Sequence, residues 1–249
     1  MAQCNGTVFR WVMCLFPAGL AASIHLTNHE WKSSHGRRCC SAMMNTKKMY
    51  VTVGSTKFDD LISAVCDLNC LKELVHQGYT HVTLQIGRGR MSRETFINLC
   101  DSNLDDEEVN RLYISSQADL DCGKIVTLRN ASLCQKPREL TVTLYRFTTG
   151  FIEDVRLSHM VVSHAGAGTC LEVLSVPRPL ITVTNDSLMD RHQSELADML
   201  TAMGVTAACV PATLEQTLRE VNVTALAQYT PGQPQLLSLY LAKKFVVQH

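Results

Sequence analysis

The chain has 249 residues, of which 46% are hydrophobic and 18% charged, and its 23 basic and 23 acidic side chains leave a formal net charge of +0. This length and apolar content suffice for a folded core and exclude a wholly disordered chain. The balanced charge argues against a protein held on nucleic acid by a basic stripe, and no apolar run reaches the ~20 residues that cross a bilayer.

Residues 1–48 form a segment whose composition differs from that of the rest. Glu30 is its single acid, whereas six residues are basic. The apolar run 11–24 suits the core of a signal peptide, and the scarcity of acids suits a transit peptide. A third interpretation is a disordered or targeting-like extension outside the working protein, which would start at Met44 or Met49. We favour an N-terminal extension, because a strand is expected directly after Met49.

From Met49 onward, short apolar runs alternate with amphipathic runs. Strands are expected at 49–53, 81–86, 141–147, 160–163, 180–184 and 207–210. Helices are expected at 61–75 (with Asp59 or Asp60 as its cap and Gly78 behind it), 151–157, 168–176, 191–203, 213–221 and 235–247. This alternation predicts an α/β fold: a Rossmann-like parallel sheet with helices on both faces, which binds ligands at the carboxyl ends of its strands.

Residues 91–138 interrupt the alternation. Their periodicity is weak, and they contain the acidic run 105–108. We interpret them as a solvated and mobile insertion on one loop of a domain that spans 49–249. An acidic run of this kind is more typical of a solvated face than of a metal site.

The 11 cysteines do not have the pattern of a metal site or a disulfide framework. None forms a Cys-x-x-Cys pair, no histidine follows at zinc-finger spacing, and their number is odd. We expect small apolar core residues in a reducing compartment.

The strongest local motif is the segment Ser163-His164-Ala165-Gly166-Ala167-Gly168-Thr169-Cys170-Leu171-Glu172. An apolar strand runs into two glycines, which allow close approach of a ligand, and then into a helix whose free N–H groups favour a phosphate. The third glycine of a dinucleotide fingerprint would fall at Leu171, so that fingerprint fits poorly. The motif therefore indicates a phosphate-binding loop, with a plain packing turn as the alternative.

Two further loops follow strands. Gly54-Ser55-Thr56 lies between the first strand and its helix, and two such ends face one ligand in a parallel sheet. Glu172, about one turn into its helix, could reach a ribose diol. The polar segment 185–193 offers the donors and acceptors that a sugar ring needs, although a generic loop or a solvated glutamate would need no ligand.

Five segments together resemble the catalytic subunits of the two-subunit UDP-N-acetylglucosamine transferases of dolichol-linked oligosaccharide synthesis. These segments are 51–60, 84–89, 161–172, 188–195 and 229–234. The most specific stretches are Ser-His-Ala-Gly-Ala-Gly-x-Cys-Leu-Glu, Gln-Ile-Gly-Arg-Gly and a late Pro-Gly-Gln-Pro. The resemblance covers most of 49–247 and leaves out the extension and the insertion.

The resemblance implies the C-terminal, donor-binding half of a GT-B glycosyltransferase, related to the bacterial lipid-linked N-acetylglucosamine transferase. It implies inverting transfer from UDP-N-acetylglucosamine to N-acetylglucosaminyl-diphosphodolichol, the second step of lipid-linked oligosaccharide assembly for protein N-glycosylation. It also implies a heterodimer with a membrane-anchored, acceptor-binding subunit at the cytosolic face of the endoplasmic reticulum. Membrane contact is then indirect, and no cofactor, metal or nucleic acid is implied.

The resemblance also assigns roles to residues. Those that would approach the diphosphate are Gly54, Ser55 and Thr56. Those that would line the same site are His164, Ala165, Gly166, Ala167, Gly168 and Thr169, while Glu172 would bind the ribose and His192 and Gln193 would face the sugar. His164 is the candidate base, although a packing or phosphate-binding role is open and the base could lie on the partner.

Two readings compete with a catalytic subunit. One is a non-catalytic nucleotide-sugar-binding or regulatory subunit, and the other is a dehydrogenase-like cofactor binder. The helix expected at 235–247 has more apolar surface than one core face needs, so we expect it to dock on the partner or back on its own sheet.

Overall fold

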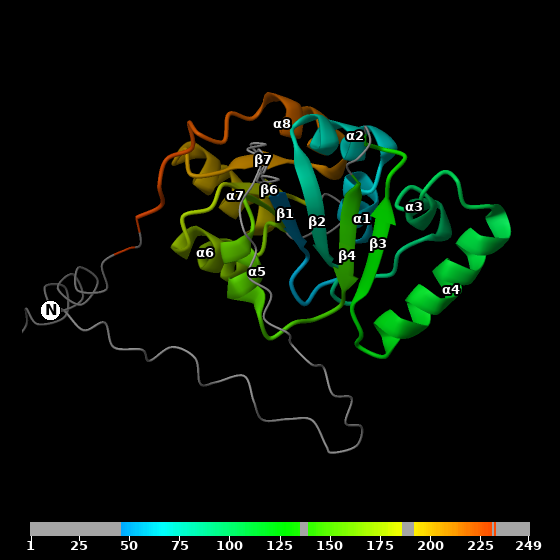
Figure 1. Ribbon diagram of the computed structural model, residues 1–249. Coiled ribbons are helices and arrows are strands. Elements are labelled where there is room, and N and C mark those ends of the chain that lie inside the picture. The colour runs from blue at the N-terminus through cyan, green and yellow to red at the C-terminus, as the bar shows by residue number, and fades with distance from the viewer. Residues whose placement is uncertain (1–45, 135–138, 186–191, 231, 233–249) are drawn as a thin grey trace, which may run out of the picture. The chain divides into compact units, whose positions relative to one another are not determined.

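The computed structural model describes residues 46–134, 139–185, 192–230 and 232 (Figure 1). Its centre is a seven-stranded sheet of order β3-β4-β2-β1-β5-β6-β7. The strands are β1 (Lys47–Thr52), β2 (Tyr79–Gln85), β3 (Val126–Asn130), β4 (Leu140–Tyr145), β5 (Met160–His164), β6 (Leu180–Val183) and β7 (Ala207–Cys209). Every neighbouring pair is parallel except β3 and β4. The predicted α/β sheet is thereby confirmed, with one antiparallel strand added at an edge.

Helices flank this sheet on both sides (Figure 1). They are α1 (Asp59–Val65), α2 (Leu68–His76), α3 (Arg93–Ile97), α4 (Asp106–Asp121), α5 (Phe151–Leu157), α6 (Ala167–Ser175), α7 (His192–Ala202) and α8 (Leu214–Glu220), with a 3-10 turn η1 (Pro211–Thr213) before the last. The helix expected at 235–247, and residues 1–45 of the expected extension, lie outside the described residues.

The alternation of side chains along the strands divides the core into two layers. On β1, Met49 and Val51 pack on one face, together with Val53 just after the strand, and Tyr50 packs on the other face. The first layer includes apolar residues of α1, α2 and α8, and the second includes those of α5, α6 and α7. β5 and β6 are buried along their whole length, as strands covered on both faces must be.

The expected helix at 61–75 is in fact two helices. α1 ends at Val65 with Cys66 as its C-cap, and Asp67 takes an extended conformation in which its carboxylate accepts a hydrogen bond from Asn69 N at 2.8 Å. Asp67 is therefore the N-cap of α2, and it redirects the chain inside a continuous apolar pattern. The prediction that Asp59 or Asp60 caps α1 is wrong, because both lie in its first turn and the N-cap is Phe58. The glycine expected behind the helix, at residue 78, has φ +85°.

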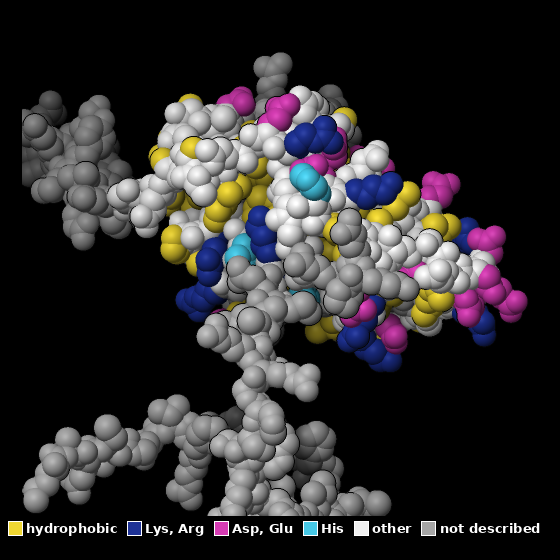
Figure 2. All heavy atoms as spheres, turned by 45° about the horizontal axis from the view of Figure 1, so that its top comes forward, with side chains coloured by type: hydrophobic (Ala, Val, Ile, Leu, Met, Phe, Trp, Pro, Cys, Tyr) yellow, Lys and Arg dark blue, Asp and Glu magenta, His cyan; other side chains and the backbone are white. Residues whose placement is uncertain are grey.

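The segment 91–138 is more regular than the loop we expected. It contains α3, the 16-residue α4 and the strand β3. The acidic run begins α4 as a capping box, in which Glu108 N donates to Asp105 Oδ1 at 2.8 Å and Asp105 N donates to Glu108 Oε2 at 3.0 Å. Figure 2 shows acidic side chains gathered at the side of the molecule where Figure 1 has α4. Weak periodicity thus concealed a helix whose terminus is determined by its cap.

Candidate functional site

The order of the strands brings two loops together. β1 pairs with β2 on one side and with β5 on the other. Strands that follow β1 are thus added toward one edge of the sheet and those that follow β5 toward the other, so the strand order reverses between β1 and β5. In open α/β sheets the loops diverge at such a point, and ligands bind there at the carboxyl edge of the sheet, in the position that we call the crevice. The loops that border it are Gly54-Ser55-Thr56 after β1 and the turn between β5 and α6. Both had been singled out from the sequence.

The loop after β1 is a tight turn. Gly54 has φ +60°, and Thr56 N donates to Val53 O at 3.2 Å. Gly54 N donates to Thr52 Oγ1 at 3.0 Å, so two of the three amides of this loop are used internally. The amide of Ser55 takes part in no hydrogen bond among the described residues, and its side chain is exposed. Ser55 is therefore the residue of this loop with a main-chain donor free for a ligand.

The turn between β5 and α6 supplies further donors. Gly166 is the N-cap of α6 and has no side chain to cap it, and the hydrogen bond from Cys170 N to Gly166 O is 2.9 Å long. The amides of Ala167, Gly168 and Thr169 lie ahead of the helical ladder, at its positive end. A Cβ atom built on Gly168 would meet nothing within 4 Å. This helix start is therefore open, as an anion site requires.

The His164 ring lies between the two loops. A Cβ atom built on Gly54 would lie 2.7 Å from His164 Cε1, and one built on Gly166 would overlap Nε2. The residue is 6% exposed, and its Nδ1 has no hydrogen-bond partner among the described residues. Burial lowers the pKa of His164 below its ordinary value, and a hydrogen bond to the Thr52 backbone offsets part of this shift. The lowered pKa favours the neutral ring, and the ring packs as a wedge between the two loops.

The structure describes the surroundings of some of the remaining candidate residues and not of others. Ala165 is buried, and its amide donates to Val183 O at 3.1 Å, which fixes the start of the turn. Glu172 is exposed on α6. His192 begins α7, while the side chains of His192 and Gln193 and the loop 186–191 lie outside the described residues. The assignments of Glu172, His192 and Gln193 therefore stay predictions.

Sequence reasoning missed the groups that hold the loop after β1 against the ends of β2 and β4. The Gln85 amide binds both the Gly54 carbonyl and the Arg146 carbonyl. Arg88 N donates to Thr56 O at 3.0 Å, and the Arg146 guanidinium donates to Gly89 O at 2.7 Å. The available signal was a polar side chain between two apolar ones at the end of the strand, as Gln85 is between Leu84 and Ile86.

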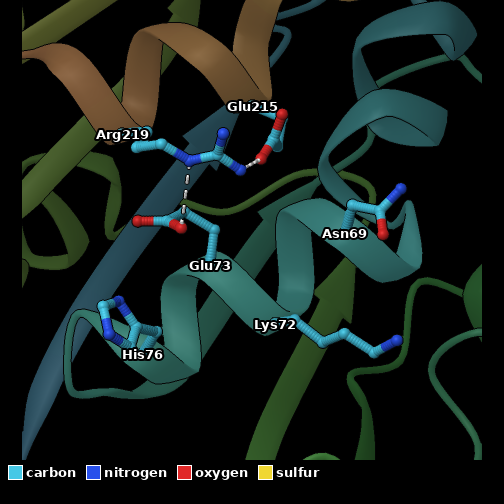
Figure 3. Close-up of a pocket in the computed structure, with 6 residues that line it drawn as sticks. All are labelled: Asn69, Lys72, Glu73, His76, Glu215 and Arg219. Atoms are coloured by element: carbon cyan, nitrogen blue, oxygen red, sulfur yellow. Dashed lines mark hydrogen bonds and ion pairs between the residues drawn. The ribbon is translucent and has the colours of Figure 1, made fainter.

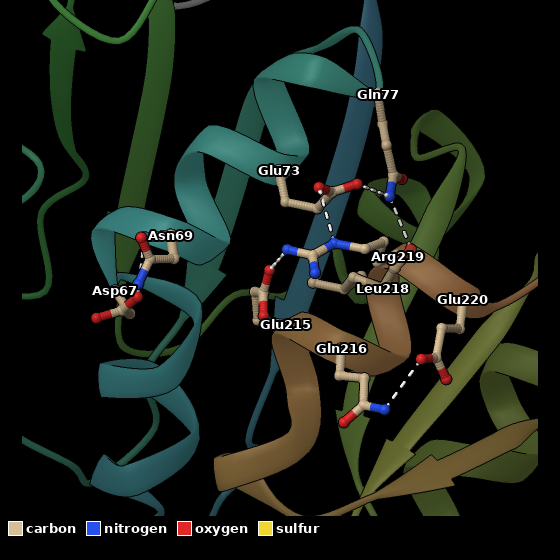
Figure 4. A network of polar contacts seen from close by, with 9 residues as sticks. All are labelled: Asp67, Asn69, Glu73, Gln77, Glu215, Gln216, Leu218, Arg219 and Glu220. Carbon is tan, nitrogen blue, oxygen red and sulfur yellow. Dashed lines mark hydrogen bonds and ion pairs between the residues drawn. The ribbon is translucent and has the colours of Figure 1, made fainter.

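A second hollow lies between α2 and α8, away from the crevice (Figure 3). It measures about 440 Å³, and its lining residues are Asn69, Lys72, Glu73, His76, Glu215 and Arg219. The charges are largely paired within it: Arg219 contacts Glu215, and its Nε lies 3.5 Å from Glu73 Oε2. Gln77 joins the same network by donating to Glu73 and to the Leu218 carbonyl (Figure 4). This network fixes α8 on α2, and exposed pairs of this kind contribute at most about 1 kcal/mol each.

The described part of the chain has neither a metal-binding cluster nor a membrane-spanning helix. It contains no cluster of three or more histidine, cysteine or acidic residues that could hold a metal ion. None of its helices combines the length and the apolarity needed to cross a bilayer. Cys66, Cys70, Cys100 and Cys170 are buried thiols that form no disulfide. Burial raises the pKa of Cys170 to about 12, as in a packing residue.

Comparison with known proteins gives consistent matches. A family model described as the glycosyltransferase family 28 C-terminal domain matches residues 49–244. A Mus musculus protein named UDP-N-acetylglucosamine transferase subunit ALG13 is 32% identical over 154 residues, which are 62% of this chain and 10% of that protein. The Saccharomyces cerevisiae protein of the same name is 31% identical over 171 residues, 68% of this chain and 80% of the relative. This chain thus matches only about a tenth of the mouse relative's length.

A solved structure agrees with the fold. The NMR solution structure of ALG13 superposes with a TM-score of 0.50 at 21% sequence identity, over 81% of this chain and 98% of that one. At this identity the likeness supports the architecture alone.

Proposed function

The chain belongs to the glycosyltransferase family 28 C-terminal domain family, and we propose that it is the donor-binding, catalytic subunit of a two-subunit N-acetylglucosaminyltransferase. Its donor is UDP-N-acetylglucosamine and its acceptor is N-acetylglucosaminyl-diphosphodolichol. The observation that carries the proposal is the pair of glycine loops at the β1–β5 crevice, which together present unpaired amides at one point. A nucleoside diphosphate is the ligand that such a site favours.

In this proposal the diphosphate lies against the Ser55 amide and the N-terminus of α6. Gly54 and Gly168 let the main chain approach it, and Thr169 adds a hydroxyl. Glu172 binds the ribose, and His192 and Gln193 face the sugar. As the bond from the anomeric carbon to the acceptor oxygen forms, the bond to the diphosphate oxygen breaks, and UDP leaves with the electron pair. The amides stabilise the charge that develops on the leaving diphosphate.

The acceptor hydroxyl must also lose its proton. His164 is the candidate base in this chain, because burial lowers its pKa and keeps the ring in the proton-accepting form. His164→Gln separates this role from packing. A base would lower kcat by roughly 100-fold or more with little change in donor affinity. A packing wedge would instead lower donor affinity and thermal stability together.

The partner in this proposal is a membrane-anchored subunit that binds the dolichol-linked acceptor at the cytosolic face of the endoplasmic reticulum. Support comes from the relatives, which are named as transferase subunits. A transferase must enclose donor and acceptor together, and the β1–β5 point of the described sheet would hold the donor alone. The segment 235–247, proposed to dock on the partner or on its own sheet, lies outside the described residues.

The test is transfer of labelled N-acetylglucosamine from UDP-N-acetylglucosamine to a short-chain N-acetylglucosaminyl-diphospholipid, by the full chain alone and with the membrane subunit. Transfer only by the pair supports the proposal. No transfer by either, with UDP-N-acetylglucosamine still bound, would favour a regulatory nucleotide-sugar-binding subunit instead.

Donor binding tests the site itself. We expect Glu172→Ala to weaken UDP-N-acetylglucosamine binding, measured by calorimetry, because the ribose loses its acceptor. Glu220→Ala is the matched control, since Glu220 is an exposed glutamate at the end of α8. Equal affinity in both variants would remove Glu172 from the site.

A further inference from the structure

Gln85 is a buried amide at the carboxyl end of β2. It is 4% exposed, and the strand register places it beside Thr52 of β1 and Tyr145 of β4. Burying an amide costs free energy unless its donors and its acceptor are paired. The partners of Gln85 therefore indicate what this side chain does.

All three partners of Gln85 belong to the ends of neighbouring strands. Its Oε1 accepts from Thr52 Oγ1 at 2.5 Å, and its Nε2 donates to Gly54 O at 2.7 Å and to Arg146 O at 2.6 Å. One side chain thus ties the chain just after β1 to the chain just after β4. Both of its N–H groups are engaged in this way.

These bonds determine the orientation of the Gly54 main chain. The Gly54 carbonyl is held by Gln85, while the Gly54 amide is held by Thr52 Oγ1 at 3.0 Å. In a trans peptide, the N–H of the next residue points opposite to the carbonyl. Drawing the Gly54 carbonyl down onto Gln85 therefore directs the Ser55 amide away from the core. This is the amide that has no hydrogen-bond partner among the described residues.

We propose that Gln85 is a positioning residue of the nucleotide site, which aims the Ser55 amide at the donor diphosphate by anchoring the opposite face of the same peptide. The inference rests on the proposed function, because it requires a diphosphate in the crevice. Thr52 is the second half of the device, since its hydroxyl orients the Gln85 amide and binds the Gly54 amide at once.

The test compares variants of the full chain for UDP binding by calorimetry and for amide exchange of residues 53–57. Gln85→Leu removes both donors at similar volume, and we expect UDP affinity to fall roughly 10-fold, as for loss of one or two hydrogen bonds. Exchange of 53–57 should quicken in the absence of any ligand. Thr52→Val should also lower UDP affinity, whereas Thr52→Ser, which keeps the hydroxyl, should bind UDP as the wild type does.

Asn130→Leu is the matched control. Asn130 is a buried amide, 2% exposed, that donates to Cys100 O at 2.6 Å within the insertion. We expect Asn130→Leu to lower thermal stability, as Gln85→Leu should, and to leave UDP affinity and the amide exchange of residues 53–57 unchanged.

The outcomes separate the two proposals. If the wild-type chain binds no UDP, the proposed function fails and this inference fails with it. If the wild type binds UDP while Gln85→Leu binds equally well, or loses no more affinity than Asn130→Leu, the inference alone is overturned. If Gln85→Leu does not fold, the Thr52 pair decides: equal affinity in Thr52→Val and Thr52→Ser overturns it.

Discussion

Gly168→Ala should make the protein more stable and a poorer binder of UDP-N-acetylglucosamine. Gly168 is the second residue of α6, is exposed, and has nothing within 4 Å of the position of a Cβ atom. Alanine in a helix is favoured over glycine by up to about 1 kcal/mol, and we expect about half of that in a first turn. For a domain of this size the melting temperature should rise by about 1–2 °C.

The effect on binding has the opposite sign. If the diphosphate approaches the main chain at Gly168, a methyl group there displaces it from the amides of the helix start. Loss of one charge-assisted hydrogen bond costs about 1.5–3 kcal/mol, which is a roughly 10- to 100-fold weaker Kd. The stability change cannot produce this loss, since it favours the folded state.

The assay is calorimetric titration of UDP-N-acetylglucosamine into each variant, together with thermal unfolding of the same samples. Asn110→Ala is the control, because Asn110 is exposed in the interior of α4 and the substitution improves helix propensity far from the crevice. Both variants should unfold at a higher temperature, and only Gly168→Ala should lose affinity. Unchanged affinity in Gly168→Ala would show that no ligand approaches this main chain and that the turn serves packing.

Three further outcomes are expected. Gly54→Ala should lower the free energy of unfolding, measured with denaturant, by roughly 2–4 kcal/mol, because φ is +60° and the new methyl group meets the His164 ring. The control Gly204→Ala, at φ +69° with open space, should lower it by only about 1–2 kcal/mol. Equal losses in the two variants would argue against the contact with His164. Asp105→Ala should cost about 1 kcal/mol by removing the cap of α4 and leave UDP affinity unchanged, and an affinity loss would link the insertion to the site. Burial lowers the pKa of His164, so as the pH falls the unfolded chain binds the proton of this residue before the folded chain does. The contribution of His164 to the free energy of unfolding is therefore complete above pH 6.5 and is lost as the pH falls through the folded pKa. His164→Gln should flatten the acid limb of a stability–pH curve. An unaltered slope would mean that His164 does not titrate differently on folding.

Sequence patterns predicted six of the seven described strands, because apolar residues in each of the six are bounded by turn residues, whereas β3 lies in the segment 91–138 that we expected to be a loop. They also located both loops of the crevice, because glycine is required where the main chain comes close to other atoms, as Gly54 and Gly166 do to the His164 ring. The break at Asp67 was missed because the apolar stripe continues across it. Gln85 was named only as part of a motif, because its role depends on main-chain groups that follow two other strands. Pairing across strands has no local periodicity that a single sequence could reveal.

The antiparallel strand β3 has a consequence for solubility. Without it, β4 would be the last strand on its side and would offer a row of unpaired main-chain groups to other molecules. β3 covers that row, and its own outer position carries Arg129, whose side chain pairs with Glu139 at 3.2 Å. A charged residue on a short edge strand discourages further strand addition. We therefore expect a chain that lacks β3 to expose the unpaired edge of β4 and to aggregate more readily.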